Sequence, residues 1–184
     1  MKFSRLFLPV AALLLSNAMF AQIYVSKNCE ASFFSASPLE NIEATAKVPK
    51  TFLNAATGDV QIEITNTAFV FEKPLMQEHF NENYMESEKF PKTVFKGKIN
   101  EKVDFTKEGE QNVTVTGKLN MHGVEKEITV PAKLNIKSGE ITVLAKFKVH
   151  IADYDIKVPS LYVQNIAEDV DIKLSGTMVP IKKN

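Results

Sequence analysis

Histidine is the side chain with the widest chemical use in this 184-residue chain, which contains three of them. His79, His122 and His150 are far apart in the sequence and lack the spacing of zinc ligands. His122 precedes Gly123 in a predicted turn, where a hydrogen-bonded structural role is expected. His150 falls on the outward face of a predicted strand. We expect no metal site, and a hydrolase or isomerase using His79 or His122 is the weaker hypothesis, because it needs a polar pocket with a carboxylate beside the histidine.

Two pairs of aspartates have the two-residue spacing found in some calcium loops. These pairs are Asp153 with Asp155, and Asp169 with Asp171. The second pair alternates with apolar residues, which is typical of the solvent-facing side of a strand. We therefore expect an ordinary outer face here.

The single cysteine, Cys29, excludes a disulfide within the chain. We expect it to be a small buried apolar residue, with pairing between two chains as the alternative. No serine stands in a nucleophile elbow, and the seven glycines form no phosphate-binding loop. The sequence therefore predicts no catalytic residue and no cofactor.

The first 21 residues have the layout of a secretory signal. A basic start is followed by the apolar run Leu6 to Leu15 and by a predicted cleavage site after Ala21, with Ala18 as the alternative. The run is too short for a membrane-spanning helix, and no comparable run follows it. We expect an exported protein, periplasmic or secreted, with one domain over residues 22–184.

The charge balance excludes a nucleic-acid surface. Basic and acidic residues number 22 each, and removal of Lys2 and Arg5 with the signal leaves a small acidic excess. Arg5 is the only arginine, so the exported chain lacks the planar fork that grips phosphates in a bidentate manner.

The elements that position these residues are predicted to be β-strands. From Gln111 to Met178, apolar and polar residues alternate with the period of half-buried strands, and short polar turns separate the runs. Short turns favour antiparallel pairing, because parallel strands need long crossovers. We count about eight such strands, and an open sheet of that width would leave bare edges. Closure into an all-β barrel or a two-layer sandwich is predicted.

One strand pattern changes parity in its middle. The apolar set occupies even positions from Val60 to Ile64 and odd positions from Phe69 to Phe71. A one-residue bulge near Asn66 would let both halves face the core.

A helical stretch interrupts the alternation. After Pro74, apolar residues recur at helical spacing, acidic residues lie mostly on the other side, and Pro91 ends the pattern. A short amphipathic helix here either caps an open barrel end or completes the core, and the pattern alone supports both.

Three motifs in order resemble the YceI-like family of exported proteins. They are His79 with Phe80, then Phe90-Pro91 with Phe95, then a hairpin in "VTGKLNMHGVEKEITVPAKL" with Gly117, Leu119, Gly123 and Val124. The similarity runs from about Tyr24 to Val179. It implies an antiparallel lipocalin-like barrel of about eight strands with a short capping helix, an interior that holds an isoprenoid or similar lipid, and no catalysis. Met76 and Gln77 stand where many members carry an Arg-Asp pair.

We expect an exported protein that sequesters or carries an amphiphilic isoprenoid, such as a polyprenyl chain or a quinone. The alternative is a non-catalytic structural or protein-binding envelope module with a filled barrel and an exposed apolar patch on its outer wall. The predicted ligand-binding residues come from the inward faces of the strands and from the predicted helix: Phe33, Phe69, Phe71, Leu75, Met76, Phe80, Tyr84, Phe95, Leu119 and Phe147.

Overall fold

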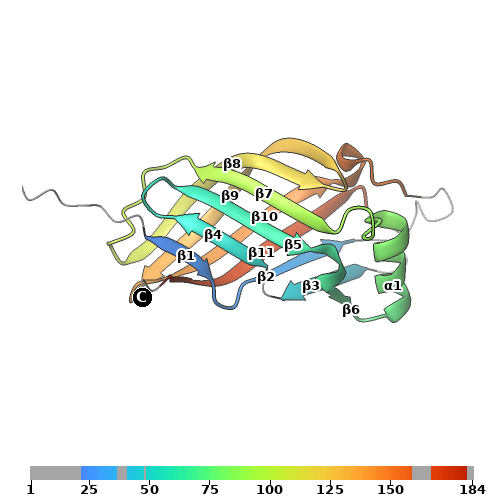
Figure 1. Cartoon of the computed structure of the whole chain (residues 1–184), viewed down its shortest axis with the longest axis horizontal. Helices are drawn as coiled ribbons and strands as arrows, with labels where there is room; N and C mark the ends of the chain where they lie inside the picture. Colours follow the sequence, from blue (N-terminus) through green and yellow to red (C-terminus); the bar gives the residue numbers. More distant parts are fainter. Residues whose placement is uncertain (1–21, 37–40, 48, 159–166, 182–184) are drawn as a thin grey trace, which may run out of the picture.

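The alternating segments form strands, as predicted. The computed structural model describes residues 22–36, 41–47, 49–158 and 167–181. These residues lie mostly in strands, with one short α-helix at one end of the molecule (Figure 1). The predicted signal lies outside these residues. The strands are β1 (Ile23–Ser26), β2 (Glu30–Ser35), β3 (Ile42–Lys47), β4 (Lys50–Asn54), β5 (Asp59–Thr65), β6 (Phe69–Phe71), β7 (Lys92–Ile99), β8 (Gly109–Met121), β9 (Val124–Lys137), β10 (Glu140–His150) and β11 (Asp169–Pro180).

Eight of these strands close into an antiparallel ring. Their order is β1-β4-β5-β7-β8-β9-β10-β11, and β11 returns to β1 through the pair Tyr24 and Pro180. Closure removes the free edges that an open sheet would present. The predicted antiparallel barrel is therefore confirmed, and the sandwich alternative is wrong.

Two long hairpins form one wall of the ring. β8 and β9 meet at a turn in which His122 and Gly123 both have positive φ, 51° and 79°. β9 and β10 meet at a similar turn of Ser138 and Gly139, with φ of 53° and 76°. Two successive residues of positive φ match the twist of the strands that such a turn joins.

The remaining strands extend one end of the barrel. β2 pairs with β11 beyond β1, β3 pairs with β2, and β6 pairs with β3. The chain breaks between β3 and β4 at Pro49, which has no backbone N–H to donate. Between β5 and β6 it passes through the 3-10 turn η1 (Asn66–Ala68). The chain thus continues past these breaks into strands that belong to the same sheet as the barrel.

The break at Asn66 lies where the parity change predicts it, but the predicted one-residue bulge is wrong in length. The turn has three residues because Asn66, which is fully buried, is fixed to the segment before β7. Its backbone N–H donates to Pro91 O at 2.9 Å, and its side-chain Nδ2 donates to Phe90 O at 2.7 Å. Its Oδ1 accepts from Thr93 Oγ1 at 2.9 Å.

A short helical segment, the cap, lies at the end that these strands extend (Figure 1). It consists of α1 (Pro74–His79) and a π-helical turn, η2 (Phe80–Tyr84). β6 pairs only with β3, and the β5–β7 ladder ends at Thr65 and Lys92, so the wall opens between β6 and β7. The predicted capping helix is confirmed. The cap ends at Tyr84, before Pro91. Glu86 has a positive φ of 43°, which is incompatible with a right-handed helix.

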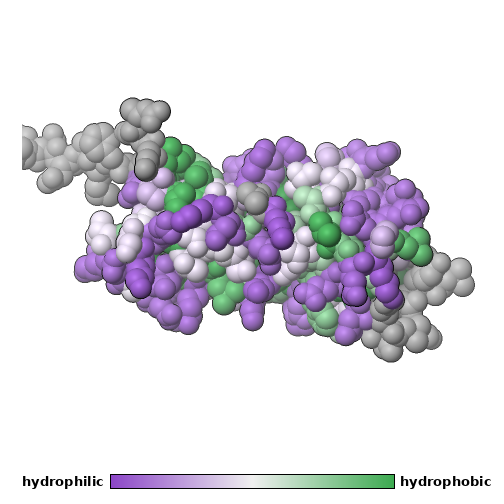
Figure 2. All heavy atoms as spheres, turned by 90° about the horizontal axis from the view of Figure 1, so that it is seen from below, coloured by the Kyte–Doolittle hydropathy of each residue, from purple (hydrophilic) through white to green (hydrophobic). Residues whose placement is uncertain are grey.

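The opposite end of the barrel is plugged by side chains. Tyr24 and Ile141 are 1% and 0% exposed, and the Phe105 ring lies 6.3 Å from that of Tyr24. Burial raises the pKa of the Tyr24 hydroxyl. The visible outer surface is mainly hydrophilic with scattered apolar residues (Figure 2).

Candidate ligand-binding cavity

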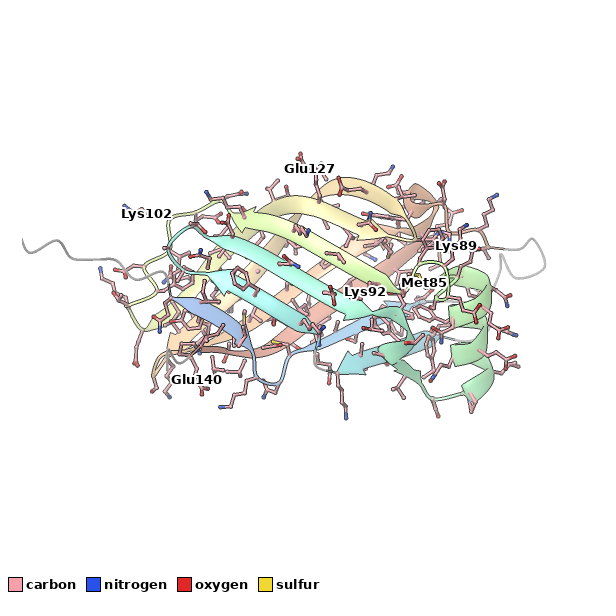
Figure 3. All side chains as sticks on the ribbon, viewed as in Figure 1. Met85, Lys89, Lys92, Lys102, Glu127 and Glu140 are labelled. Carbon is pink, nitrogen blue, oxygen red and sulfur yellow. The ribbon has the colours of Figure 1, made fainter. Side chains whose placement is uncertain are left out.

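The barrel encloses an apolar cavity of about 610 Å³. Small side chains leave much of this space: Ala132 and Ala145 face each other across β9 and β10, and Ala31 lies in the wall on β2. None of the described lining residues is lysine, arginine, aspartate or glutamate. Charged side chains such as Lys102, Glu127 and Glu140 point outward instead (Figure 3). Such a space suits a hydrocarbon, because an apolar wall offers water few hydrogen-bond partners.

Nine of the ten residues nominated from the sequence line this cavity. Whether they contact a ligand stays a prediction. They are Phe33, Phe69, Phe71, Met76, Phe80, Tyr84, Phe95, Leu119 and Phe147.

Leu75 lies outside the cavity wall and is 59% exposed. The inward face of the cap is set by Met76 and Phe80, which are one turn apart. Leu75 precedes Met76 by one residue, which rotates it by about 100° around the helix axis and into solvent.

The wall also contains aliphatic residues that the prediction omits, such as Val115, Val130 and Leu134. Their inward direction is visible in the alternation of β8 and β9. The prediction selected mainly large side chains, whereas inward-facing residues of all sizes line the cavity.

Four phenylalanines join the cap to the extended end of the barrel. Phe80 stacks on Phe33 with ring centroids 5.5 Å apart, and it approaches Phe69 and Phe71 at 5.5 and 5.1 Å. Phe33 also meets Phe69 and Phe71 edge to face, at 5.4 and 5.8 Å. These four rings all line the cavity. They place the aromatic part of the wall directly under the cap.

His79 is the only basic side chain among the described lining residues, and it has no hydrogen-bond partner in the part of the chain that the structure describes. Two other polar lining residues, Ser35 and Thr93, have hydrogen-bond partners within the chain. Ser35 Oγ accepts from Ala167 N at 3.0 Å, and Thr93 donates to Asn66. A carboxylate is absent from the described lining, so His79 lacks the partner that an acid–base site would need.

His122 contacts a carboxylate, that of Glu86, which the sequence did not predict. Its Nε2 lies 2.7 Å from Glu86 Oε2, its Nδ1 lies 3.0 Å from Tyr154 O, and its ring packs 4.6 Å from that of Phe90. The helical pattern after Pro74 predicts that the acidic residues of this stretch, including Glu86, lie mostly on the outward side. No local pattern indicates this contact, because Glu86 and His122 are 36 residues apart and both adopt a positive φ. Neither side chain lines the cavity, so the pair fastens the segment after the cap to the β8–β9 turn.

Cys29 is buried, as expected for a small apolar residue. Burial raises the pKa of its thiol, although a hydrogen bond from Thr51 opposes the shift. A thiol of raised pKa is a poor nucleophile.

Three of the four aspartates contact basic side chains on the surface. Asp153 lies 3.2 Å from Lys126, Asp171 lies 3.2 Å from Lys148, and Asp169 lies 3.0 Å from His150. The described residues contain no cluster of three or more metal-ligating side chains. Within the described ranges, no helix has the length and apolar character needed to cross a bilayer.

A closed antiparallel barrel with an enclosed apolar cavity and a helical cap defines the lipocalin-like class of binding proteins. Within this class, residues 23–178 match the YceI-like domain, and the chain belongs to that family. No curated protein matches the sequence.

Solved structures share the fold at low sequence identity. A polyisoprenoid binding domain from Saccharophagus degradans, implicated in plant cell wall breakdown, has a TM-score of 0.73 and 15% identity, covering 86% of this chain and 98% of its own. Burkholderia cenocepacia BcnA has a TM-score of 0.68 and 16% identity, with 81% and 95% covered. The YceI protein of Campylobacter jejuni has a TM-score of 0.58 and 17% identity, with 73% and 81% covered.

Proposed function

We propose that this protein is exported and non-catalytic, and that it sequesters or carries an amphiphilic isoprenoid, such as a polyprenyl chain or a quinone, in its barrel. The observation that carries the proposal is the apolar cavity of about 610 Å³ under a helical cap. A filled barrel, which the structural or protein-binding alternative requires, would have no such space. The polyisoprenoid binding domain of similar fold supports the ligand class.

The energetics of burial allow binding without a charged anchor. A tail that buries about 20 methylene equivalents gains roughly 16 kcal/mol at ~0.8 kcal/mol each. Loss of translational freedom and ordering of the tail cost about 4–15 kcal/mol. The remainder supports useful affinity, whereas selectivity among similar tails would be weak.

Export is part of the proposal because of the signal-like layout of residues 1–21. Members of the family to which the chain belongs are typically exported. Mass spectrometry of the secreted or periplasmic fraction would detect a chain that begins after Ala21 or Ala18, and a full-length chain retained in the cytoplasm would contradict export.

The ligand test is organic extraction of the purified protein followed by mass spectrometry. We expect an isoprenoid lipid in near-stoichiometric amount in the extract. Protein without any extractable lipid, which also fails to take up prenyl alcohols or quinones added in detergent, would refute the proposed function.

A further inference from the structure

The outer wall of the barrel has a shallow groove on the other side of the sheet from the cavity. It crosses β4, β5, β7 and β8, which are neighbours in the sheet (Figure 1). The directly paired Gly97 and Gly117 line it with backbone alone, so no side chain fills the groove at that point.

Three lysines line the groove. Lys96 lies directly opposite Lys118 across β7 and β8, and Lys98 is two residues further along β7 on the same face. Asp59 is the one acidic residue of the described lining, and it accepts a hydrogen bond from Thr57 Oγ1 at 2.6 Å. The groove therefore carries a net positive charge, although the chain as a whole is neutral.

Two of these lysines are unpaired. Lys118 lies 2.8 Å from Glu125, whereas Lys96 and Lys98 have no ion-pair partner in the part of the chain that the structure describes. Like charges directly opposite each other destabilise a pair of strands. The fold gains nothing from placing Lys96 beside Lys118, and the two unpaired charges are available to an anionic partner.

An exposed aromatic ring lies on the β4 side of the groove. Phe52 is 39% exposed, and a row of direct cross-strand partners runs from it through Gln61 and Lys96 to Lys118. The residues of such a row point to the same side of the sheet. The face therefore combines an apolar ring with ammonium groups, as surfaces that bind at the boundary between water and lipid do.

The chemistry of the groove favours a layer of lipid headgroups over a protein. Lysine is a point charge without the planar fork of arginine, and it is depleted in protein–protein interfaces. Directional groups are few, because Thr116 Oγ1 already accepts from Asn100 Nδ2 and lies 2.9 Å from Thr129 Oγ1. An anionic membrane surface attracts lysine by charge and needs no fixed pattern of donors.

We propose that the outer face of β4, β5, β7 and β8 docks the barrel on an anionic lipid bilayer through Lys96, Lys98 and Phe52. β7 also borders the opening between β6 and β7, so docking brings that opening toward the bilayer. Docking is reversible, because each lysine near an anionic surface strengthens binding by only about fivefold. The inference goes beyond the proposed function, since it does not depend on which ligand the barrel holds.

Cosedimentation with vesicles tests this face. The protein is used as residues 22–184, which contain every strand that the structure describes, because the apolar run of the predicted signal would itself enter a bilayer. Vesicles of phosphatidylcholine with phosphatidylglycerol should bind the protein at low ionic strength, and added salt should weaken this binding. Vesicles of phosphatidylcholine alone should bind it at least about tenfold more weakly.

A double variant removes the unpaired charges. Lys96→Gln with Lys98→Gln should weaken binding to the anionic vesicles about 25-fold. It should not lower the free energy of unfolding, because it removes a like-charge pair. The matched control is Lys146→Gln with Lys173→Gln, which should change binding less than about twofold. These two lysines are also directly opposite and have no ion-pair partner among the described residues, but β10 and β11 lie on the opposite side of the ring.

The aromatic contact has its own test. Phe52→Ser should weaken binding to the anionic vesicles about fivefold. The loss should be similar at low and at high salt, because salt screens the lysines and not an apolar contact.

The outcomes that overturn the proposal are distinct. Equal weakening by the two double variants, or no binding to anionic vesicles at low ionic strength, shows that this face does not dock on a membrane. Tighter binding of a polyglutamate peptide than of the vesicles, lost in Lys96→Gln with Lys98→Gln, assigns the groove to an acidic protein instead. None of these results affects the proposed function, which fails separately if extraction and lipid uptake both reveal no ligand.

Discussion

At the scale of single residues, the contact between Glu86 and His122 ties the cap to the barrel. Both residues have a left-handed backbone, and the imidazole meets the Glu86 carboxylate on one side and the Tyr154 carbonyl on the other. The ring is only 9% exposed, so its loss removes a buried contact with the Tyr154 carbonyl and a partly buried contact with Glu86.

We expect His122→Ala to lower the free energy of unfolding by about 2–3 kcal/mol, through lost hydrogen bonds to a carbonyl and a carboxylate. Urea denaturation monitored by circular dichroism measures this change. His150→Ala is the control and should cost less than about 0.5 kcal/mol, since its side chain is largely solvated. Equal effects of the two variants would show that the contact to Glu86 does not stabilise the fold.

At the scale of elements, two glycines allow β7 and β8 to approach closely. Gly97 and Gly117 are directly paired, and a Cβ on Gly117 would collide with the Gly97 Cα and the Lys96 carbonyl. A Cβ on Gly97 would lie 2.7 Å from the Phe95 ring in the cavity wall. A side chain at either position would therefore displace neighbouring atoms.

Gly117→Ala should destabilise the protein by about 1–3 kcal/mol, because backbone rather than a flexible side chain must move. Thermal and urea unfolding measure the loss. Thr142→Ala, at an exposed position of β10, is the matched strand control. A Gly117→Ala variant as stable as that control would mean that the two strands separate easily at this point.

Three strands are joined on the surface by Glu63 of β5. Its Oε1 lies 3.0 Å from Lys92 of β7 and 3.6 Å from Lys50 of β4. The hydrogen bond from Lys92 lowers the pKa of Glu63 in the folded protein, with a smaller contribution from Lys50. A lowered folded-state pKa stabilises the fold above the unfolded-state value of about 4.3, and this stability is lost as the pH falls through the folded-state pKa.

Glu63→Gln should therefore cost less than about 1 kcal/mol at neutral pH, since solvent screens the exposed pair. The cost should vanish in acid, where the carboxyl of the natural chain is neutral in both states. Unfolding curves across this pH range test the prediction. Glu43→Gln, at an exposed position of β3, serves as the control, and an equal cost at all pH values would contradict the role of the charge.

The strands were predictable from the sequence because burial on one side imposes a two-residue period. The parity change from Ile64 to Phe69 even located the break in β5 and β6, but the three-residue length of η1 depends on contacts of Asn66 with Phe90 and Pro91 that no local pattern contains. Closure itself was open between a barrel and a sandwich, since only the long-range pairing of Tyr24 with Pro180 decides it.

The lining residues on strands were predictable, because side chains alternate between the inside and the outside of the barrel. The lining residues on the cap were less predictable, because the direction of each side chain depends on the rotation of the helix about its axis. Phe69 and Phe147 line the cavity as their parity indicates. Leu75 belongs to the apolar stripe that the helical spacing predicts, yet its side chain is exposed to solvent in the structure. The sequence alone did not show whether His79 lies in a cavity wall or in a packed core, because this depends on how the cap packs against the barrel.

At the scale of the whole molecule, the cavity depends on small residues facing each other. Ala132 and Ala145 form a direct cross-strand pair in the wall. A larger side chain at either position would extend into empty space instead of into packed atoms. A substitution at either alanine can therefore reduce the space for a ligand without a large change in the stability of the fold.

Ala145→Leu should weaken binding of an added prenyl alcohol about tenfold, because the new side chain occupies space that the tail would fill. The free energy of unfolding should stay within about 1 kcal/mol of the natural chain, since cavity filling offsets local strain. Dye displacement and urea denaturation measure the two quantities. Ala152→Leu, on the exposed part of η3 (Ile151–Tyr154), is the control; unchanged affinity in Ala145→Leu would place the ligand elsewhere.

The pairing of β1 with β11 also has a consequence for the order in which the molecule assembles. Ribosomes make β1 first and β11 last, so the seam between Tyr24 and Pro180 forms only after synthesis of the last strand. Contacts this distant in sequence slow folding. In refolding experiments, a fluorophore pair across that seam should report a later phase than a pair across the β8–β9 turn, and simultaneous signals would show that the ring forms in one step.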